Sequence, residues 1–365
     1  MLSLSKHSYT RPMWQPGALS RTVLALIWLV LGIAMIAVSV WLGWTRWPAI
    51  LNGHPAMLIA GIACGLLGFI AVAWAIGSLT VGDRQDREGS GHSAHRTSKQ
   101  VLRRAHWRII FAIPALVLAF LLVVVLAYAR PFVATPTATA AFRSENGVRL
   151  ADRLGWYELI PARHDASGDV IRPTAGLVFL PGARIDSRAY ANVLRPIAEA
   201  GYLVAVLKEP FGFSFLDADH GRKILDVHPE ITNWLAGGHS LGGSTAALLA
   251  DQDERVKGLV LFASYPGDPL VRDDLQVASI SGTADGFTTP ADIEASKGNL
   301  PPAASYVVIN GAVHSSFGDY GEQPGDGIAT VDRTTVQAEI NKATLGLLAS
   351  LSAPPPPPPP PPKKK

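Results

Sequence analysis

The sequence predicts an α/β fold, a mostly parallel sheet with helices on both faces, preceded by three membrane-spanning helices. Short apolar runs alternate with helical patterns over the C-terminal part of the chain, which is typical of parallel strands and crossover helices. Three apolar segments without a charged residue lie before them. The 365 residues are 48% hydrophobic, which is high for a purely soluble protein.

The three apolar segments are residues 22–43, 56–79 and 109–128. Each has about the ~20 residues that a helix needs to cross the hydrocarbon core. The first is longer than the apolar stretch of a secretion signal and ends without a small-residue cleavage motif, so we expect a retained span. The single cysteine, Cys64, lies in the second segment and excludes an intramolecular disulfide.

Lys and Arg are distributed unevenly around these segments. Residues 1–130 hold 12 Lys or Arg against 3 Asp or Glu, whereas the remainder holds 20 against 26. Basic residues gather before the first span, where they are Lys6, Arg11 and Arg21. They also gather in the second loop, where they are Arg84, Arg87, Arg96, Lys99, Arg103, Arg104 and Arg108. The first loop has one, Arg46. The positive-inside rule then predicts a cytoplasmic N-terminus (residues 1–21) and an extracytoplasmic chain after Arg130. Since anionic lipid explains the basic excess, we expect no nucleic-acid binding.

The predicted organisation has three further parts after this membrane anchor (residues 22–130). Residues 131–141, mostly Pro, Thr and Ala, indicate a short extended linker with little to bury. Residues 142–351 form the α/β domain. Residues 352–365 form a tail of nine prolines and three lysines. This tail is either a disordered end or a polyproline II ligand for a partner's aromatic groove.

The predicted strands are residues 156–160, 176–180, 202–207, 234–237, 258–262, 277–281 and 306–309. The predicted helices are residues 187–200, 241–251, 289–297 and 333–351. Continuous apolar runs such as GLVFL and GLVLFA indicate strands buried on both faces of the sheet.

The motif that suggests chemistry is Gly238-His239-Ser240-Leu241-Gly242, which fits G-x-S-x-G. A nucleophile elbow strains its serine and crowds the positions two residues away on either side, where glycine is needed. An apolar strand precedes the motif and a small-residue helix follows it. The alternative is an ordinary glycine-rich turn. We expect His239 to have a packing role.

A serine nucleophile requires a histidine base and an acid that orients it. Asp285 and His314 each follow a predicted strand, and the carboxyl ends of parallel strands share one edge of the sheet. Competing residues fit less well. His220 and His228 lie in a polar stretch and are expected on the surface, Asp268 lies in a Pro/Gly loop, and Asp292 lies at a helix start.

An oxyanion hole needs two hydrogen-bond donors. The backbone N–H of Leu241, the residue after the serine, is one candidate. Ala183 or Gly182, in the loop after the strand at 176–180, is the other, although that loop could be a plain turn. This chemistry requires no metal or organic cofactor.

Successive runs in the chain resemble the compact bacterial α/β-hydrolase family often labelled family 5. They are GLVFLPGARIDSRAYANVLRPIAEAGYLVAVLKEPF, GGHSLGG, LFASYPGD, SGTADGFTTPADIEASKGNLP and GAVHSSFGDYGEQPGDG. The resemblance covers residues 142–348 and leaves the spans and the tail unexplained. It implies an α/β-hydrolase fold with Ser240 as nucleophile, Asp285 as acid and His314 as base. The family's substrates are mostly undefined.

The predicted function is hydrolysis of an ester or related acyl bond in a small molecule by an enzyme held at the membrane. Only about a dozen residues separate two strands between which many lipases insert a cap, so the loops at 209–219 and 315–327 should select the substrate. A non-catalytic, membrane-tethered module that docks through its proline tail is the alternative. Transport is weakly supported because the spans contain no Asp, Glu, Lys, Arg or His.

Overall fold

The computed structural model describes residues 16–88, 98–164 and 167–352. Its contacts divide the chain into two compact units. One unit contains the residues up to Thr45 and Ile59–Tyr128, and the other contains Arg46–Leu58 and the chain from Ala129 onward. The proline tail, the first residues and part of the predicted cytoplasmic loop lie outside the described residues.

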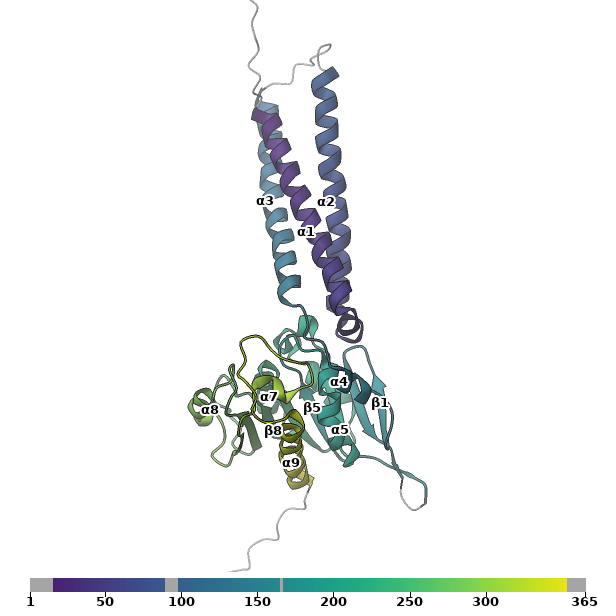
Figure 1. The fold of residues 1–365 in the computed structure, drawn as a ribbon, viewed down its shortest axis with the longest axis vertical. Coiled ribbons are helices and arrows are strands. Elements are labelled where there is room, and N and C mark those ends of the chain that lie inside the picture. The colour runs from purple at the N-terminus through teal and green to yellow at the C-terminus, as the bar shows by residue number, and fades with distance from the viewer. Residues whose placement is uncertain (1–15, 89–97, 165–166, 353–365) are drawn as a thin grey trace, which may run out of the picture. The chain divides into compact units, whose positions relative to one another are not determined.

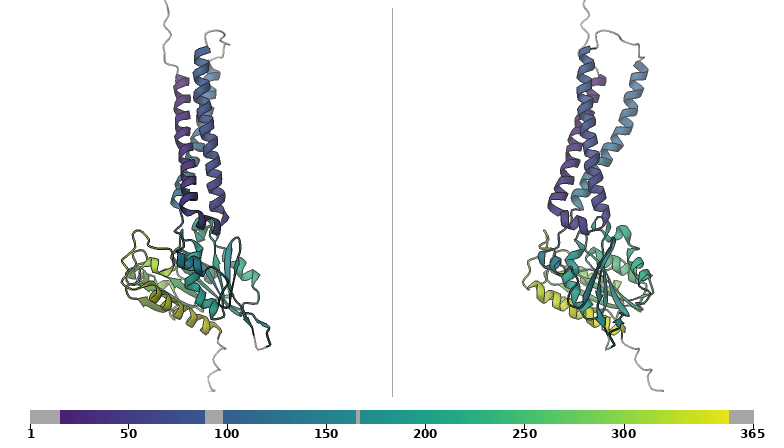
Figure 2. Two further views of the ribbon diagram at one scale, coloured as in Figure 1. Left: turned by 45° about the vertical axis from the view of Figure 1, so that its right-hand side comes forward. Right: turned by 90° about the vertical axis from the view of Figure 1, so that its right-hand side faces the viewer.

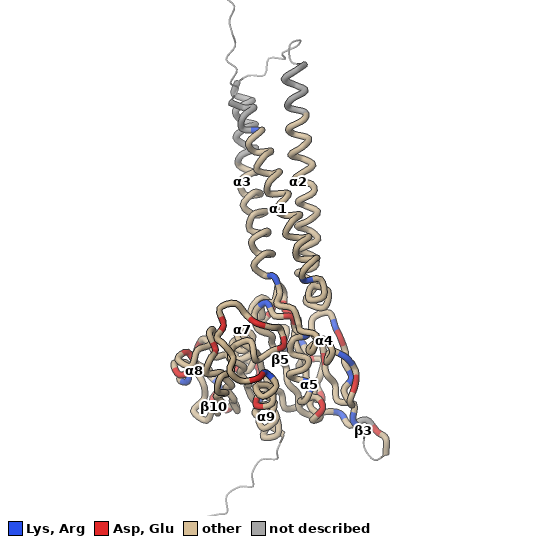
Figure 3. The backbone as a smooth tube through the Cα atoms, in the orientation of Figure 1, with Lys and Arg blue, Asp and Glu red and all other residues tan. Residues whose placement is uncertain are grey.

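The first unit contains most of three long helices, namely α1 (Pro16–Asn52), α2 (Pro55–Glu88) and α3 (Ser98–Tyr128) (Figure 1). Their stretches Arg21–Asn52, Pro55–Thr80 and Ile110–Tyr128 have hydropathies of 2.8, 2.5 and 3.1. Figure 3 shows very few charged positions along the described parts of these helices. By length and composition, all three could cross a membrane.

Glycines allow α1 and α2 to approach closely. A β-carbon on Gly68 would lie 2.7 Å from the carbonyl oxygen of Gly32, and one on Gly32 would lie 2.9 Å from the carbonyl oxygen of Gly68. Small residues at such crossings let apolar helices pack without a hydrophobic driving force between them.

The second unit contains an eight-stranded sheet in the order β1-β2-β6-β5-β7-β8-β9-β10. Its strands are β1 (Val148–Asp152), β2 (Trp156–Pro161), β5 (Ala175–Leu180), β6 (Leu203–Leu207), β7 (Asn233–His239), β8 (Val256–Phe262), β9 (Gln276–Gly282) and β10 (Ser305–Ile309). Neighbours from β6 to β10 pair in parallel, whereas β1 and β2 are antiparallel. A separate two-stranded sheet pairs β3 (Arg163–His164) with β4 (Val170–Ile171). The prediction of a mostly parallel sheet is confirmed.

Helices cover both faces of this sheet. They are α4 (Pro136–Ala141), α5 (Ala191–Glu199), α6 (His220–Val227), α7 (Leu241–Gln252), α8 (Pro290–Ser296) and α9 (Arg333–Ser352). Alternate residues of β5 enter opposite cores. Leu177 and Phe179 pack with α4, α5 and α9, whereas Val178 and Leu180 pack with α6 and α7. Figure 2 shows α9, in yellow, beside the strands in both views.

The predicted extended linker at residues 131–141 is wrong in its second half, because Pro136–Ala141 is helix α4. Thr135 caps this helix by accepting the N–H of Ala138, and the side chain of Ala138 is fully buried. The Pro, Thr and Ala composition has no apolar period of its own. Its small side chains nevertheless pack closely against α5 once the domain forms.

Candidate active site

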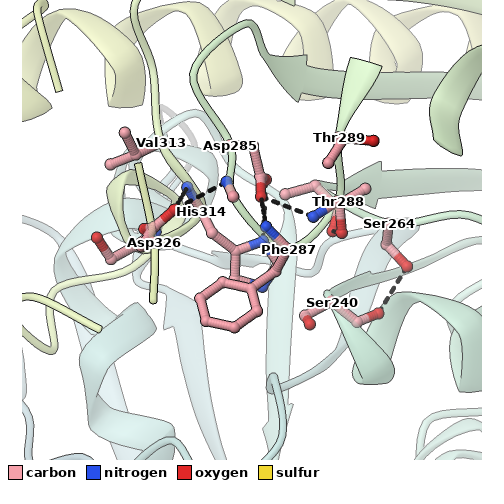
Figure 4. Close-up of polar contacts among 12 residues, drawn as sticks. Ser240, Ser264, Asp285, Phe287, Thr288, Thr289, Val313, His314 and Asp326 are labelled. Atoms are coloured by element: carbon pink, nitrogen blue, oxygen red, sulfur yellow. Dashed lines mark hydrogen bonds and ion pairs between the residues drawn. The ribbon is translucent and has the colours of Figure 1, made fainter. Parts of the chain in front are cut away.

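Ser240 lies in the sharp turn between β7 and α7. Its φ of +53° and ψ of −127° belong to a region that residues with a β-carbon rarely occupy. The Ser240 N–H donates to the carbonyl oxygen of Phe262 (3.0 Å), and the Ser264 hydroxyl donates to the carbonyl oxygen of Ser240 (2.6 Å; Figure 4). The end of β8 and the loop after it therefore hold the serine in the strained conformation of a nucleophile elbow.

The glycines two residues before and after Ser240 are sterically required. A β-carbon on Gly238 would lie 2.4 Å from the carbonyl carbon of Gly242. One on Gly242 would lie 2.2 Å from the carbonyl oxygens of both Leu180 and Pro181. Any other residue at position 238 would clash within the elbow, and any other residue at position 242 would push apart the elbow and the loop after β5.

The structure brings Asp285 and His314 together. Asp285 follows β9 and His314 follows β10, and these strands pair in parallel. The His314 Nδ1 lies 2.9 Å from the Asp285 Oδ2, and both side chains are buried, at 2% and 0% exposure. A buried carboxylate at this distance orients an imidazole.

The second oxygen of Asp285 is held by the backbone. Its Oδ1 accepts the N–H groups of Phe287 (2.8 Å) and Thr288 (2.7 Å), as Figure 4 shows. Both carboxylate oxygens are thus engaged, and only Oδ2 faces the imidazole. The ring of Phe287, 44% exposed, lies 5.3 Å from the ring of His314.

The loop after β5 was predicted to supply an oxyanion donor from Gly182 or Ala183. The N–H of Gly182 already donates to the Tyr190 hydroxyl (3.0 Å). Among the described residues, the N–H of Ala183 has no hydrogen-bond partner. Leu241 is the first residue of α7, so its N–H has no acceptor within the helix. Ala183 and Leu241 are therefore the available donors of the predicted set.

His239 is buried behind the elbow. Its Nδ1 lies 2.8 Å from the Tyr190 hydroxyl, and its ring is 4.6 Å from the ring of His314 and stacks on Phe317. Burial, with the nearby His314 as a smaller contribution, holds the pKa of His239 well below its ordinary value. The ring is consequently neutral at physiological pH, and Tyr190 connects it to the loop after β5.

The competing residues lie away from the Asp285–His314 pair. His220 is buried rather than on the surface as predicted, because its ring packs against Trp156 and its Nδ1 bonds Asp217 (2.8 Å). His228 is partly buried and contacts Glu158. Asp292 accepts the N–H of Thr289 and caps α8. Asp268 is exposed.

Asp326 belongs to the site although the sequence did not identify it. Its carboxylate accepts the backbone N–H groups of Gly286, His314, Ser315 and Gly327. A carboxylate in a loop between Pro, Gly and Gly carries no local signal for such a role. The only hint is its closeness in sequence to His314.

Within the described ranges, no group of three or more His, Cys, Asp or Glu side chains could hold a metal ion. The chemistry considered below uses the side chains and backbone N–H groups of the chain.

Residues 176–338 match the family model described as "Alpha/beta hydrolase family". No curated protein sequence matches the chain. Among solved structures, a dienelactone hydrolase-like promiscuous phosphotriesterase from metagenomic libraries is 18% identical, with 54% of this chain and 92% of that chain covered and a TM-score of 0.41. A putative dienelactone hydrolase from Klebsiella pneumoniae is 15% identical (52% and 92% covered, TM-score 0.38). A ferulic acid esterase from Streptomyces cinnamoneus is also 15% identical (55% and 85% covered, TM-score 0.40).

The matched residues include every position of the candidate site, from the loop after β5 to Asp326. They also include the parallel strands that carry these positions. The match over residues 176–338 therefore supports a hydrolase with the α/β-hydrolase fold.

Proposed function

We propose that the chain is a membrane-anchored serine esterase that cleaves an ester or related acyl bond in a small molecule. In this proposal Ser240 is the nucleophile, His314 the base and Asp285 the acid. The observation that carries it is the buried contact of 2.9 Å between His314 and Asp285. Ser240 has elbow geometry and directly follows His239, whose ring lies 4.6 Å from the ring of His314, although no hydrogen bond joins Ser240 to His314 in the described part of the chain. These are the residue types and the chain order that a Ser-His-Asp triad requires.

In the first half-reaction, the Ser240 Oγ attacks the substrate carbonyl carbon and its proton passes to the Nε2 of His314. The tetrahedral intermediate then collapses, the bond to the alcohol breaks, and the imidazolium gives its proton to the leaving alcohol. Asp285 stabilises the imidazolium through the Nδ1–Oδ2 contact. The product is an acyl-Ser240 ester and a free alcohol.

In the second half-reaction, His314 takes a proton from water as the water oxygen attacks the acyl carbon. The bond to Ser240 breaks, the proton returns to its Oγ, and a carboxylic acid leaves. In both halves, negative charge develops on the carbonyl oxygen, and the N–H groups of Leu241 and Ala183 would stabilise it. Such a donor contributes about 2.7 to 4 kcal/mol to the transition state.

The substrate side of the site favours an apolar group. The rings of Phe287 beside His314 and Phe215 in the 209–219 loop are 44% and 59% exposed. Exposed aromatic rings bind apolar acyl or aryl groups by burying their surface. We infer an ester with such a group as the substrate class.

Labelling with a fluorophosphonate tests the nucleophile. The full-length chain in detergent should be labelled at Ser240, and Ser240→Ala should abolish both labelling and hydrolysis of p-nitrophenyl esters. Ser305→Ala is a matched control. Ser305 begins β10, at the end of that strand away from His314, and its hydroxyl donates to the carbonyl oxygen of Val277. Equal labelling of the Ser240→Ala variant would contradict the proposal.

We also propose that the three apolar helices hold the hydrolase unit on the extracytoplasmic side. The charge distribution of the loops supports this orientation. A reporter fused after Lys365 should be active outside the cytoplasm, and one placed between residues 89 and 97 should be active inside. The reverse pattern would exclude this topology while leaving the esterase proposal intact.

A further inference from the structure

Asp326 has an unusual set of partners for a side chain outside the predicted triad. Its Oδ1 accepts the N–H groups of Gly286 (3.2 Å), His314 (3.1 Å) and Gly327 (2.8 Å). Its Oδ2 accepts the N–H of Ser315 (2.8 Å). Three of these four donors belong to the two loops that carry Asp285 and His314.

These bonds connect positions that are far apart in the sequence. Gly286 directly follows Asp285, and the N–H of His314 belongs to the histidine itself. Asp326 lies 40 residues after Gly286 and 12 after His314. The Asp326 carboxylate thus joins the backbone of the loop that carries Asp285 to the backbone of the loop that carries His314.

The loop around Asp326 fits between the other two without spare room. A β-carbon on Gly327 would lie 1.8 Å from the carbonyl oxygen of Ala284, and one on Gly286 would lie 2.8 Å from the carbonyl oxygen of Gly325. Gly325 has a φ of +93°, which favours glycine. Close backbone contact therefore fixes the carboxylate in position from both sides.

Asp326 does not compete with Asp285 as the acid. Both of its oxygens are directed to backbone N–H groups, whereas the Asp285 Oδ2 faces the His314 Nδ1. Burial alone would raise the pKa of Asp326, but its four N–H donors outweigh burial and hold that pKa below its ordinary value. The group is an ionised acceptor, which strengthens each of the bonds.

We propose that Asp326 is a positioning residue that holds the His314 imidazole at hydrogen-bond distance from Asp285. It acts through the backbone of both loops and does not touch the reacting atoms. This inference rests on the proposed triad function. Small displacements of a catalytic group have large kinetic effects, on the order of 10²-fold for a 1 Å error.

Asp326→Asn tests the proposal because asparagine keeps the size and replaces one acceptor oxygen with an NH₂ group, which cannot accept the N–H of a neighbour. We expect kcat to fall by roughly 10- to 100-fold with little change in KM. Hydrogen exchange at residues 284–287 and 314–316 should become faster.

The matched control is Asp251→Asn. The Asp251 Oδ1 also accepts two backbone N–H groups, those of Val271 (2.8 Å) and Arg272 (2.9 Å), and the residue is likewise partly exposed. This variant should keep the wild-type kcat and KM. A change of equal size in both variants would overturn the proposal by showing a general loss of stability.

Gly325→Ala is the second variant, needed if Asp326→Asn does not fold. Its β-carbon would meet only the Phe287 ring, at 3.4 Å, but the φ of +93° is strained for alanine and should displace the carboxylate. The same fall in kcat at constant KM is expected, with a smaller size. A wild-type kcat in the folded variants would overturn the proposal.

Failure of the positioning role and failure of the esterase proposal give different results. If Ser240→Ala and Asp285→Asn abolish turnover while Asp326→Asn behaves as wild type, only the positioning role is wrong. If Ser240→Ala turns over esters at the wild-type rate, both the proposed triad and the proposed role of Asp326 are wrong.

Discussion

The Nδ1 of His314 and the Oδ2 of Asp285 are 2.9 Å apart and buried, although 29 residues separate them in the chain. Two adjacent parallel strands, β9 and β10, end at the same edge of the sheet and bring these loops together. Four properties of the surrounding structure lead to predictions that can be tested one residue at a time.

Asp285→Asn should lower kcat by on the order of 10³-fold or more, because the amide can no longer fix the tautomer of His314 or stabilise its protonated form. Steady-state kinetics with a p-nitrophenyl ester measure the effect. Asp292→Asn is the control, since Asp292 only caps α8. A fully active Asp285→Asn variant would remove Asp285 from the catalytic residues.

Gly242→Ala should prevent folding or lower the free energy of unfolding by more than ~3 kcal/mol, because its β-carbon would meet two carbonyl oxygens at 2.2 Å. Gly346→Ala is the matched control. Gly346 lies in α9 with nothing within 4 Å of the added carbon, so alanine should stabilise the helix by about 0.5 to 1 kcal/mol. Thermal unfolding of both variants would decide the matter, and equal midpoints would contradict the steric argument.

Tyr190→Phe should lower both stability and kcat. Its hydroxyl accepts the Gly182 N–H and contacts His239, so its loss leaves buried polar groups unpaired, at a cost of about 1 to 3 kcal/mol. The loop that carries Ala183 would also lose an anchor. Tyr157→Phe serves as control, because the buried Tyr157 hydroxyl bonds the carbonyl oxygen of Ser187 instead. This control should lose stability but keep kcat.

Glu209 should make the protein less stable as pH rises. Both its carboxylate oxygens are buried without a hydrogen-bond partner among the described residues, in a cavity of about 40 Å³ that Ser187 also lines. Burial raises the pKa of Glu209 well above its ordinary value, so the folded chain keeps the proton. The contribution of Glu209 to the free energy of unfolding is fully present below its pKa in the unfolded chain, ~4.3. That contribution is lost as pH rises through the pKa of Glu209 in the folded chain.

Glu209→Gln should therefore raise the melting temperature at neutral pH and flatten its decline with pH. Differential scanning calorimetry between pH 4 and 8 measures both effects. Glu294→Gln, an exposed position in α8, is the comparison. A melting temperature that falls equally with pH in the Glu209→Gln variant and in the wild type would show that another group is responsible.

The sequence by itself determined the parts of the protein that depend on local pattern. Continuous apolar runs identified the strands from β5 to β10, and three charge-free segments identified α1, α2 and α3. Gly238 and Gly242 marked the elbow because only glycine fits its crowded backbone. Asp285 and His314 could be selected because each lies within a few residues of the end of a strand.

Only the tertiary structure decided the features that depend on contacts between distant segments. The Tyr190 hydroxyl occupies the N–H of Gly182 and leaves Ala183 as the available donor. Ala138 of α4 and the side chain of His220 are buried by surfaces that other segments provide. Asp326 is directed to N–H groups as far as 40 residues away. Hydrogen bonds and burial of this kind follow from the three-dimensional path of the chain, and local composition does not encode them.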